Sequence, residues 1–400
     1  MKIVQLSTSF GGGAGIAARR LNTALCSNGL NSQIFAISNR MIELSDNEFI
    51  INRSKIKRIE SSLVTGIQSK LIQSDHGLVS PFSISSINAN HRAIEDADVI
   101  HIHATFNLIS EKALRDILHL KKKFFITMHD SRIFTGGCHT PLDCNQFRSK
   151  CSKCPQVKIP FRGIIENAFN RRLDTFANNN LINFISPSKW LANEAAESRV
   201  LKNKNIVIVR NPIPEIFALQ NREKNREKHG FLAAEIVVAF VAGDLSNPNK
   251  GIKTLIEATR IVLASTNRAY RFIFIGKNLD KSKLVGLEYE TFETNSELQL
   301  AELLSAADIL IVPSLSDNSP NVIGEALMSG LLVSGSNIGG IAEVLNEMGF
   351  PLFEAKDAKG LAEIVITFDH TYNHELIRTK AQSILGYSVI ANKMKEIYSS

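Results

Sequence analysis

Two carboxylates, Asp317 and Glu325, are separated by seven residues in the stretch DNSPNVIGEALMSG. The short, apolar, β-branched run ADILIVP before them predicts a buried parallel strand, and residues 322–329 predict the first turns of a helix. We therefore expect Asp317 on a loop at the carboxyl end of a strand, where α/β sheets bind ligands. A helix beginning near Asn321 would offer N–H groups and a positive dipole end to a phosphate, and Glu325 in its first turn could accept hydrogen bonds from a ribose diol. The alternative is an ordinary first-turn glutamate and a turn-forming aspartate.

A glycine-rich turn is the second feature with chemical potential. Gly11, Gly12, Gly13 and Gly15 follow the first apolar run and open a predicted helix over residues 14–25. Without Cβ atoms this turn can approach a ligand closely and direct N–H groups at an anion. The spacing GGGAG does not match the dinucleotide fingerprint GxGxxG, which argues against a cofactor-dependent dehydrogenase.

One lysine and two histidines are expected at the same kind of sheet edge. Lys250, in GDLSNPNKG, precedes a predicted helix over residues 252–265, and a solvated lysine at a helix start is the alternative. His129, in ITMHD, directly follows a predicted central strand, although a lone histidine is often structural. His101 and His103 alternate on DVIHIHAT and share one face, where they could line an acceptor side, bind metal or cap a sheet edge. Only His103, nearer the carboxyl end, is expected on the acceptor side.

Four of the five cysteines fall within one segment, GGCHTPLDCNQFRSKCSKCP, as Cys138, Cys144, Cys151 and Cys154. Because a reducing cytoplasm disfavours disulfides, clustered thiols with a terminal CxxC favour a tetrahedral structural zinc site. The other spacings are not those of standard zinc fingers, so free thiols and disulfides stay open. Four ligands would close the coordination sphere, so the zinc would order the loop and would not activate water.

The elements that position these residues alternate as short apolar runs and longer helical patterns, which predicts parallel sheets wound with helices. We expect an N-terminal domain over residues 1–205 and a C-terminal domain over 206–385. A last helix at about 389–399, within 386–400, should pack back on the first domain, and two prolines in NPIPE (211–215) mark the joint. Strands are predicted at 3–6, 32–37, 99–103, 124–128 and 184–186, then at 206–209, 236–242, 271–275, 309–312 and 331–334.

Length and composition agree with two α/β domains, because 400 residues exceed one typical core. No run approaches the roughly 18 apolar residues of a membrane helix, and the N-terminus lacks an export signal, so we expect a cytoplasmic protein. Residues 1–200 hold 25 Lys and Arg against 16 Asp and Glu. The basic clusters at 53–58 and 121–123 could hold the chain on anionic lipid, or could simply be solvated. Nucleic acid is not expected, because neither cluster has an aromatic-rich recognition motif beside it.

The acidic stretch resembles the motif of two carboxylates separated by seven residues in family 4 retaining glycosyltransferases of the GT-B fold. There the first position is usually Glu, and Asp317 is one methylene shorter. TGGCHTPLDC with its following cysteines, together with SPSKW at 186–190, is similar to bacterial transferases that assemble surface polysaccharides on lipid carriers. The resemblance implies two doubly wound, Rossmann-like domains facing a cleft.

The resemblance also implies roles for individual residues. His129, Lys250, Asp317 and Glu325 would be catalytic, with His129 near the donor sugar and Lys250 neutralising the departing diphosphate. Related enzymes carry an arginine soon after the loop glycine, and Asp244 stands in that place here. The donor would contact the glycine turn, the loop glycine and the acidic stretch, through Gly12, Gly13, Gly15, Gly243, Asn318, Ser319, Pro320, Asn321, Val322 and Glu325.

The function implied is retaining transfer of a hexose from a nucleotide-diphosphate donor to a growing, lipid-linked glycan, such as an exopolysaccharide or O-antigen. The chemistry requires no cofactor, and a peripheral position on the inner face of the membrane would suit such an acceptor. Two other classes stay open. A GT-B sugar-nucleotide epimerase would need no acceptor, and a zinc-dependent nucleic-acid-binding protein would use the basic first half.

Overall fold

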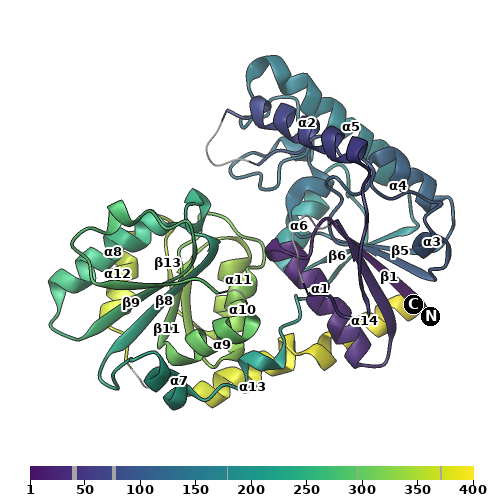
Figure 1. The fold of residues 1–400 in the computed structure, drawn as a ribbon. Coiled ribbons are helices and arrows are strands. Elements are labelled where there is room, and N and C mark those ends of the chain that lie inside the picture. Colours follow the sequence, from purple (N-terminus) through teal and green to yellow (C-terminus); the bar gives the residue numbers. More distant parts are fainter. Residues whose placement is uncertain (38–42, 74–77, 178, 295, 370–371) are drawn as a thin grey trace. The chain divides into compact units, whose positions relative to one another are not determined.

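A computed structural model describes residues 1–37, 43–73, 78–177, 179–294, 296–369 and 372–400 (Figure 1). These residues form two compact units. Unit 1 comprises Met1–Pro212 and Ile390–Ser400, and unit 2 comprises Ile213–Val389. The chain thus enters unit 2 between two closely spaced prolines, Pro212 and Pro214, and returns to unit 1 within its last helix.

Unit 1 contains a seven-stranded sheet in the order β3-β2-β1-β4-β5-β6-β7, and every pairing in it is parallel. Ile3, Val4 and Ile100 are completely buried, as expected for strands covered on both faces. The strand order reverses between β1 and β4, which is where ligands bind in such sheets. The strands are β1 (Lys2–Ser7), β2 (Asn31–Ala36), β3 (Glu48–Ile50), β4 (Val99–Ile102), β5 (Lys123–Thr127), β6 (Ile182–Ser186) and β7 (Ile206–Ile208).

Helices surround this sheet, and several begin at a serine that accepts a backbone N–H. Ser54, Ser110 and Ser188 cap α2, α4 and α6 in this way. The helices of unit 1 are α1 (Gly12–Ser27), α2 (Lys55–Leu71), α3 (Arg92–Glu95), α4 (Glu111–Leu118), α5 (Arg162–Phe176) and α6 (Lys189–Glu197). The end of α14 (Tyr387–Ser399) also belongs to this unit, and the Lys123 ammonium donates to the Tyr398 carbonyl at 2.9 Å.

Unit 2 contains a six-stranded parallel sheet in the order β10-β9-β8-β11-β12-β13. Apolar side chains pack on both of its faces, around Leu310 on one side and Ile309 on the other. The strands are β8 (Ile236–Asp244), β9 (Tyr270–Lys277), β10 (Tyr289–Phe292), β11 (Ile309–Val312), β12 (Leu332–Ser336) and β13 (Leu352–Phe353). The helices are α7 (Arg222–Lys228), α8 (Ile252–Ser265), α9 (Glu297–Ala306), α10 (Asn321–Met328), α11 (Gly339–Met348), α12 (Ala358–Ile366) and α13 (His374–Leu385).

The predicted class, two parallel α/β sheets, is confirmed by these topologies. One strand prediction is wrong in its assignment, because β7 pairs with β6 in the first sheet and does not open the second domain. The first unit therefore extends to Pro212, beyond the expected boundary at residue 205. Among the helices that the structure describes, none has the length and apolar content that a membrane-crossing helix needs.

Candidate functional site

In unit 2, two of the predicted catalytic residues form an ion pair. The Lys250 Nζ lies 2.6 Å from Asp317 Oδ2, with side chains 33% and 17% exposed. Lys250 ends a short 3-10 turn (Pro248–Lys250) before α8, and Asp317 lies on the loop between β11 and α10. Because β8 and β11 are neighbours in the sheet, both residues follow adjacent carboxyl ends. The convergence expected from the sequence is thus present between these two residues.

Backbone packing fixes the separation of the two loops. The Leu315 N–H donates to the Asn249 carbonyl at 2.8 Å. Gly251 adopts a left-handed φ of +71°, and a Cβ at this position would lie 1.8 Å from the Pro313 carbonyl oxygen. Only glycine fits here without displacing the turn that carries Lys250.

The acidic stretch continues into α10, which begins at Asn321 as predicted. The residues expected to contact the donor lie on the preceding loop and in the first turn, where they are partly exposed: Asn318, Ser319, Pro320, Asn321 and Val322. Glu325 is placed differently from the expectation, because it is the fifth residue of the helix and so belongs to the second turn. It is only 5% exposed. The helix N-terminus supplies backbone N–H groups and a positive dipole end beside this loop.

Gly243 is the penultimate residue of β8 and is exposed, and a Cβ there would have no atom within 4 Å. The adjacent Asp244 accepts hydrogen bonds from the Ser246 hydroxyl, the Ser246 N–H and the Asn278 amide. These hydrogen bonds lower the pKa of Asp244. Asp244, which stands where related enzymes carry an arginine, therefore stabilises its own loop and brings no positive charge.

In unit 1, the glycine-rich stretch begins α1 and is not a separate loop, since the helix starts at Gly12. Gly12 and Gly13 are exposed with open space around them. Gly15 is buried, and a Cβ there would lie 2.3 Å from the Ser9 carbonyl oxygen. Gly15 thus allows close packing of α1, whereas Gly12 lines a broad hollow of about 1380 Å³ that is also lined by Arg53, Arg58 and Phe106.

A chain of buried hydrogen bonds connects β1 to His129. The Gln5 amide nitrogen donates to Asn22 Oδ1 at 3.2 Å and to Ser32 Oγ at 3.0 Å. The Gln5 oxygen then faces His103 Nε2 at 2.8 Å, and His103 Nδ1 lies 3.2 Å from His129 Nε2. Gln5 and His103 are 0% and 4% exposed. Both ring nitrogens of His103 are therefore engaged inside the protein.

These contacts fix the proton positions on both rings. Because the Gln5 oxygen can only accept, His103 Nε2 must carry a proton, and its Nδ1 must accept in the neutral ring. His129 Nε2 therefore donates, and His129 Nδ1 is its accepting nitrogen. Burial, partly offset by the Asp130 carboxylate, lowers the pKa of His129 to about 4, so the ring is neutral at pH 7.

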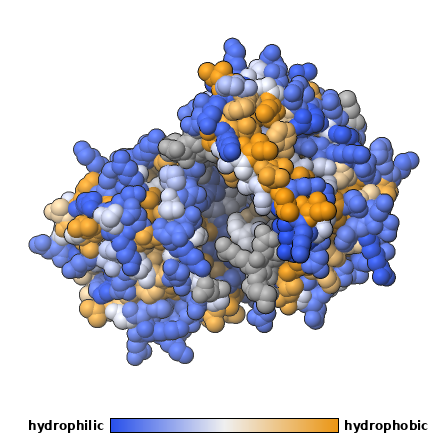
Figure 2. Space-filling view, turned by 45° about the horizontal axis from the view of Figure 1, so that its top comes forward, coloured by the Kyte–Doolittle hydropathy of each residue, from blue (hydrophilic) through white to orange (hydrophobic). Residues whose placement is uncertain are grey.

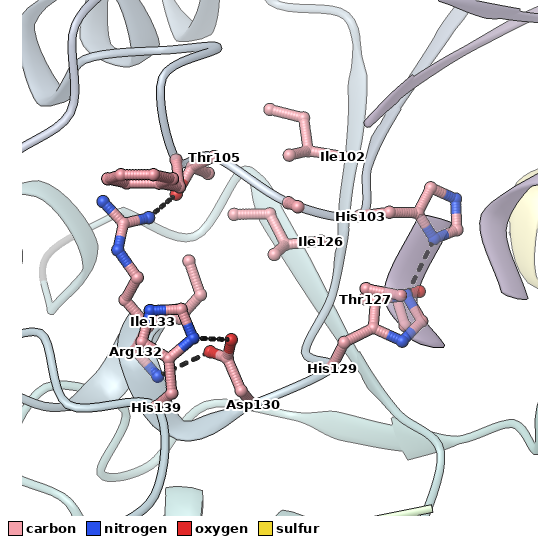
Figure 3. A pocket seen from close by; sticks show the side chains of 13 residues that line it. Ile102, His103, Thr105, Ile126, Thr127, His129, Asp130, Arg132, Ile133 and His139 are labelled. Atoms are coloured by element: carbon pink, nitrogen blue, oxygen red, sulfur yellow. Dashed lines mark hydrogen bonds and ion pairs between the residues drawn. The ribbon is translucent and has the colours of Figure 1, made fainter. Parts of the chain in front are cut away.

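Next to His129 lies a small cavity of about 60 Å³ that sequence reasoning only partly foresaw (Figure 3). The Asp130 Oδ2 lies 2.7 Å from His139 Nδ1, and Arg132 donates to the Thr105 hydroxyl. Burial alone would raise the pKa of Asp130, but the charge and hydrogen bond of His139, with contributions from Arg132, lower it to about 2. Asp130, Arg132 and His139 were not predicted as site residues. Their proximity in sequence to His129 and Cys138 was the available signal.

His101 faces the C-terminal helix and not the cavity. Its Nδ1 lies 2.6 Å from the Tyr398 hydroxyl and its Nε2 lies 2.7 Å from the Thr127 hydroxyl. Both His101 and Tyr398 are completely buried. Burial, with a smaller effect of His129, lowers the pKa of His101 to about 3. This histidine therefore anchors the last helix to the sheet of unit 1.

The four clustered cysteines line one cavity of about 10 Å³, which is enough space for about one water molecule. Desolvation raises the pKa of Cys138 and Cys154 and raises that of Cys151 to about 12. Across the described part of the chain, no group of three or more His, Cys, Asp or Glu side chains is arranged to hold a metal ion. The structure thus brings the four residues together, and zinc binding stays a prediction.

Part of this chain is similar to known glycosyltransferases. Residues 235–368 match the family described as Glycosyl transferases group 1. The chain is 27% identical to the Bacillus subtilis protein TuaC over 38% of this chain and 37% of that protein. The name of TuaC describes it as a teichuronic acid biosynthesis glycosyltransferase. It is 22% identical to the gpi3 subunit of the Schizosaccharomyces pombe phosphatidylinositol N-acetylglucosaminyltransferase, over 93% of this chain and 77% of that protein. The match thus spans little more than a third of the first relative.

Solved structures share the fold over the whole chain. Sucrose-phosphate synthase from Thermosynechococcus elongatus superposes with a TM-score of 0.68 at 17% identity, covering 100% of this chain and 98% of that one. Anabaena HepE in complex with UDP-glucose gives a TM-score of 0.66 at 17% identity, covering 100% and 99%. Residues 235–368 therefore form a glycosyl transferases group 1 domain, and the chain has the GT-B fold.

Proposed function

We propose that this protein is a retaining glycosyltransferase that moves a hexose from a nucleotide-diphosphate donor to a growing, lipid-linked glycan. The observation that carries the proposal is the ion pair of Lys250 and Asp317 beside the N-terminus of α10, inside the glycosyl transferases group 1 domain. HepE has been solved with UDP and with UDP-glucose, so UDP-hexoses are the first donors to test. TuaC is named for teichuronic acid biosynthesis, and we propose a glycan of the exopolysaccharide or O-antigen type as the product here.

On the donor side, Lys250 and the α10 N-terminus would neutralise the diphosphate, and Glu325 would accept hydrogen bonds from the ribose. The bond between the sugar C1 and the diphosphate oxygen breaks, and the electron pair leaves with the diphosphate. Asp317 stabilises the positive charge that develops on the sugar. The acceptor oxygen bonds to C1 on the face that the diphosphate leaves, and its proton passes to a diphosphate oxygen.

Unit 1 would supply the acceptor side. Its hollow carries Arg53 and Arg58, which suit a phosphate of a lipid-linked acceptor. Neutral His129 would accept a hydrogen bond from a hydroxyl of the donor sugar through Nδ1. We assign His103 to positioning His129, because both of its own nitrogens are engaged. Peripheral attachment to the cytoplasmic membrane would bring the enzyme to such an acceptor.

No cofactor is proposed for the chemistry itself. The four cysteines that line the second cavity belong to the chain segment that follows His129. His139, the residue after Cys138, lines the cavity beside His129. A zinc ion there would order the segment without joining the reaction. This role for Cys138, Cys144, Cys151 and Cys154 remains a prediction.

The test combines calorimetric titration of UDP with transfer of labelled hexose from UDP-sugars to a lipid-linked acceptor extract. Lys250→Ala and Asp317→Asn should abolish transfer, and Lys250→Ala should also weaken UDP binding. Glu325→Gln, which conserves volume at a buried position, should weaken UDP binding. The matched control is Lys253→Ala, whose side chain is 90% exposed on the neighbouring helix and should behave like wild type.

Two outcomes would contradict the proposal. One is unchanged UDP affinity and transfer in Lys250→Ala when the protein remains folded. The other is conversion of the donor sugar to an isomer without any acceptor, which would indicate an epimerase. Slow hydrolysis of the donor alone agrees with a transferase that lacks its acceptor.

A further inference from the structure

Helix α2 has its apolar side chains on the outside. Ile56, Ile59, Leu63 and Ile67 are 69%, 60%, 62% and 53% exposed. Their spacing of three, four and four residues places them on one face over three turns. The residues that the helix buries are Ser61, Gln68 and Leu71, of which two are polar. The apolar face of α2 is therefore turned to solvent, whereas a helix that packs on a core turns its apolar face inward.

Other apolar side chains continue this face at the end of α2. The Lys158 N–H donates to the Leu71 carbonyl at 3.0 Å, and the Lys158 ammonium donates to the Lys70 carbonyl at 3.0 Å. The next turn, Ile159–Phe161, presents Ile159 at 72% and Phe161 at 37% exposure. In Figure 2 a band of hydrophobic surface crosses the part of the molecule where Figure 1 places α2.

Basic side chains surround these apolar residues. Lys55 and Lys70 are exposed at the two ends of α2, Lys57 lies in its first turn, and Lys158 is exposed beside its end. Glu60, which pairs with Lys57 at 2.9 Å, is the acidic residue of the helix. We name this set the α2 surface, defined by Ile56, Ile59, Leu63, Ile67, Ile159, Phe161, Lys55, Lys57, Lys70 and Lys158.

We propose that the α2 surface docks unit 1 onto an anionic phospholipid bilayer. The apolar side chains would enter the boundary between headgroups and acyl chains, and the lysines would reach lipid phosphates. An exposed apolar stripe with basic flanks is the pattern of a helix that lies in the plane of a membrane surface. This inference rests on the peripheral attachment proposed above and names the surface that makes it. Binding to vesicles can be measured without donor or acceptor, so it is tested separately from glycosyl transfer.

The charge of the surface favours lipid over a second copy of this chain. A symmetric dimer through α2 would oppose lysines to lysines, and like charges at an interface cost free energy. An anionic bilayer instead pairs each lysine with phosphate. The side of α2 opposite the stripe is also relevant, because Arg58, Ser61 and Thr65 there line the hollow that we propose for the acceptor. One helix would therefore have the bilayer on one side and a lipid-linked acceptor on the other.

The experiment is sedimentation of the full chain with phosphatidylcholine vesicles that contain or lack phosphatidylglycerol. We expect binding to the anionic vesicles, weakened by added salt. Ile59→Gln/Leu63→Gln should reduce binding at least about tenfold, because two large apolar side chains lose their burial in lipid. Lys55→Gln/Lys70→Gln should reduce it by about fivefold per lysine, which corresponds to about 1 kcal/mol each.

The matched control is Leu219→Gln/Leu376→Gln, which removes two leucines of unit 2 that are 77% and 66% exposed. It should bind vesicles like wild type. All changes are at exposed positions, and melting temperatures will verify that the variants fold. Lack of wild-type binding to anionic vesicles would overturn the proposal, as would equal losses in the α2 and control variants. A dimer in sedimentation velocity that dissociates in Ile59→Gln/Leu63→Gln would instead make the surface an interface between copies.

Discussion

Replacing Gly251 with alanine tests whether backbone packing positions Lys250. Gly251 has φ +71°, and its added Cβ would lie 1.8 Å from the Pro313 carbonyl oxygen. Real Cβ contacts essentially never fall below 3.0 Å, so the turn must retreat by about 1.2 Å, the difference between the two distances. The left-handed φ adds about 1–2 kcal/mol of strain.

The two effects can be separated with Gly349, which caps the C-terminus of α11 with φ +74° and where an added Cβ would have no atom within 4 Å. Gly349→Ala should lose only the stability that this strain costs, about 1–2 kcal/mol. Gly251→Ala should lose more stability and should also move Lys250, the preceding residue. A misplacement of about 1 Å at a catalytic group can cost about 100-fold in rate.

The assay is urea denaturation of both variants, followed by UDP titration and hexose transfer. We expect Gly349→Ala to retain wild-type UDP affinity and transfer, and Gly251→Ala to lose both while still folded. If Gly251→Ala is no less stable than Gly349→Ala and transfers hexose at the wild-type rate, the packing of the two loops does not position Lys250.

Three further predictions follow from unit 1. Gln5→Leu leaves the buried His103 Nε2–H without its acceptor, so we expect a loss of about 1–3 kcal/mol of stability. We also expect a changed His129 tautomer, measured by side-chain 15N NMR shifts. An unchanged tautomer would refute the hydrogen-bond chain. His101 has its pKa lowered to about 3 in the folded state against about 6.5 unfolded, so the unfolded chain binds more protons between these values. Stability should fall as pH drops below about 6.5, by at most about 1.4 kcal/mol per pH unit from this residue, and His101→Gln should flatten the profile in chemical denaturation. Purified protein should contain one zinc per chain, and metal analysis without zinc, together with four freely titrating thiols, would remove the site at Cys138, Cys144, Cys151 and Cys154.

Much of the fold was accessible from the sequence, because buried parallel strands are short apolar runs that stand out between helices. The predicted strand over 309–312 coincides with β11, and the predicted helix over 252–265 coincides with α8. The strands β3, β10 and β13 were not predicted, because each lies at the edge of a sheet and has only two to four residues. The strand predicted at 206–209 was assigned to the wrong domain, because strand pairing depends on tertiary packing that a local apolar run does not encode.

The candidate site was predictable where it depends on the end of a strand. Lys250 and Asp317 both follow strands in the sequence, and the pairing of β8 with β11 brings them together. Gln5 was not identified, because a polar residue within β1 gives no local sign of its partner. The register of β1 with β4 places Gln5 opposite His101, and its side chain then reaches His103. Contacts that depend on register between distant segments are not visible in a single sequence.

Helix α2 shows why periodicity and burial must be considered together. Its apolar residues recur at helical spacing, which by itself predicts a face packed on the core. The basic cluster at residues 53–58 suggested lipid, but charge alone did not distinguish a docking surface from a solvated one. Burial decides, because Ser61 and Gln68 face the protein while four large apolar side chains remain outside. Exposure of that much apolar surface is costly in water, so a surface that later covers it explains the pattern better than charge alone.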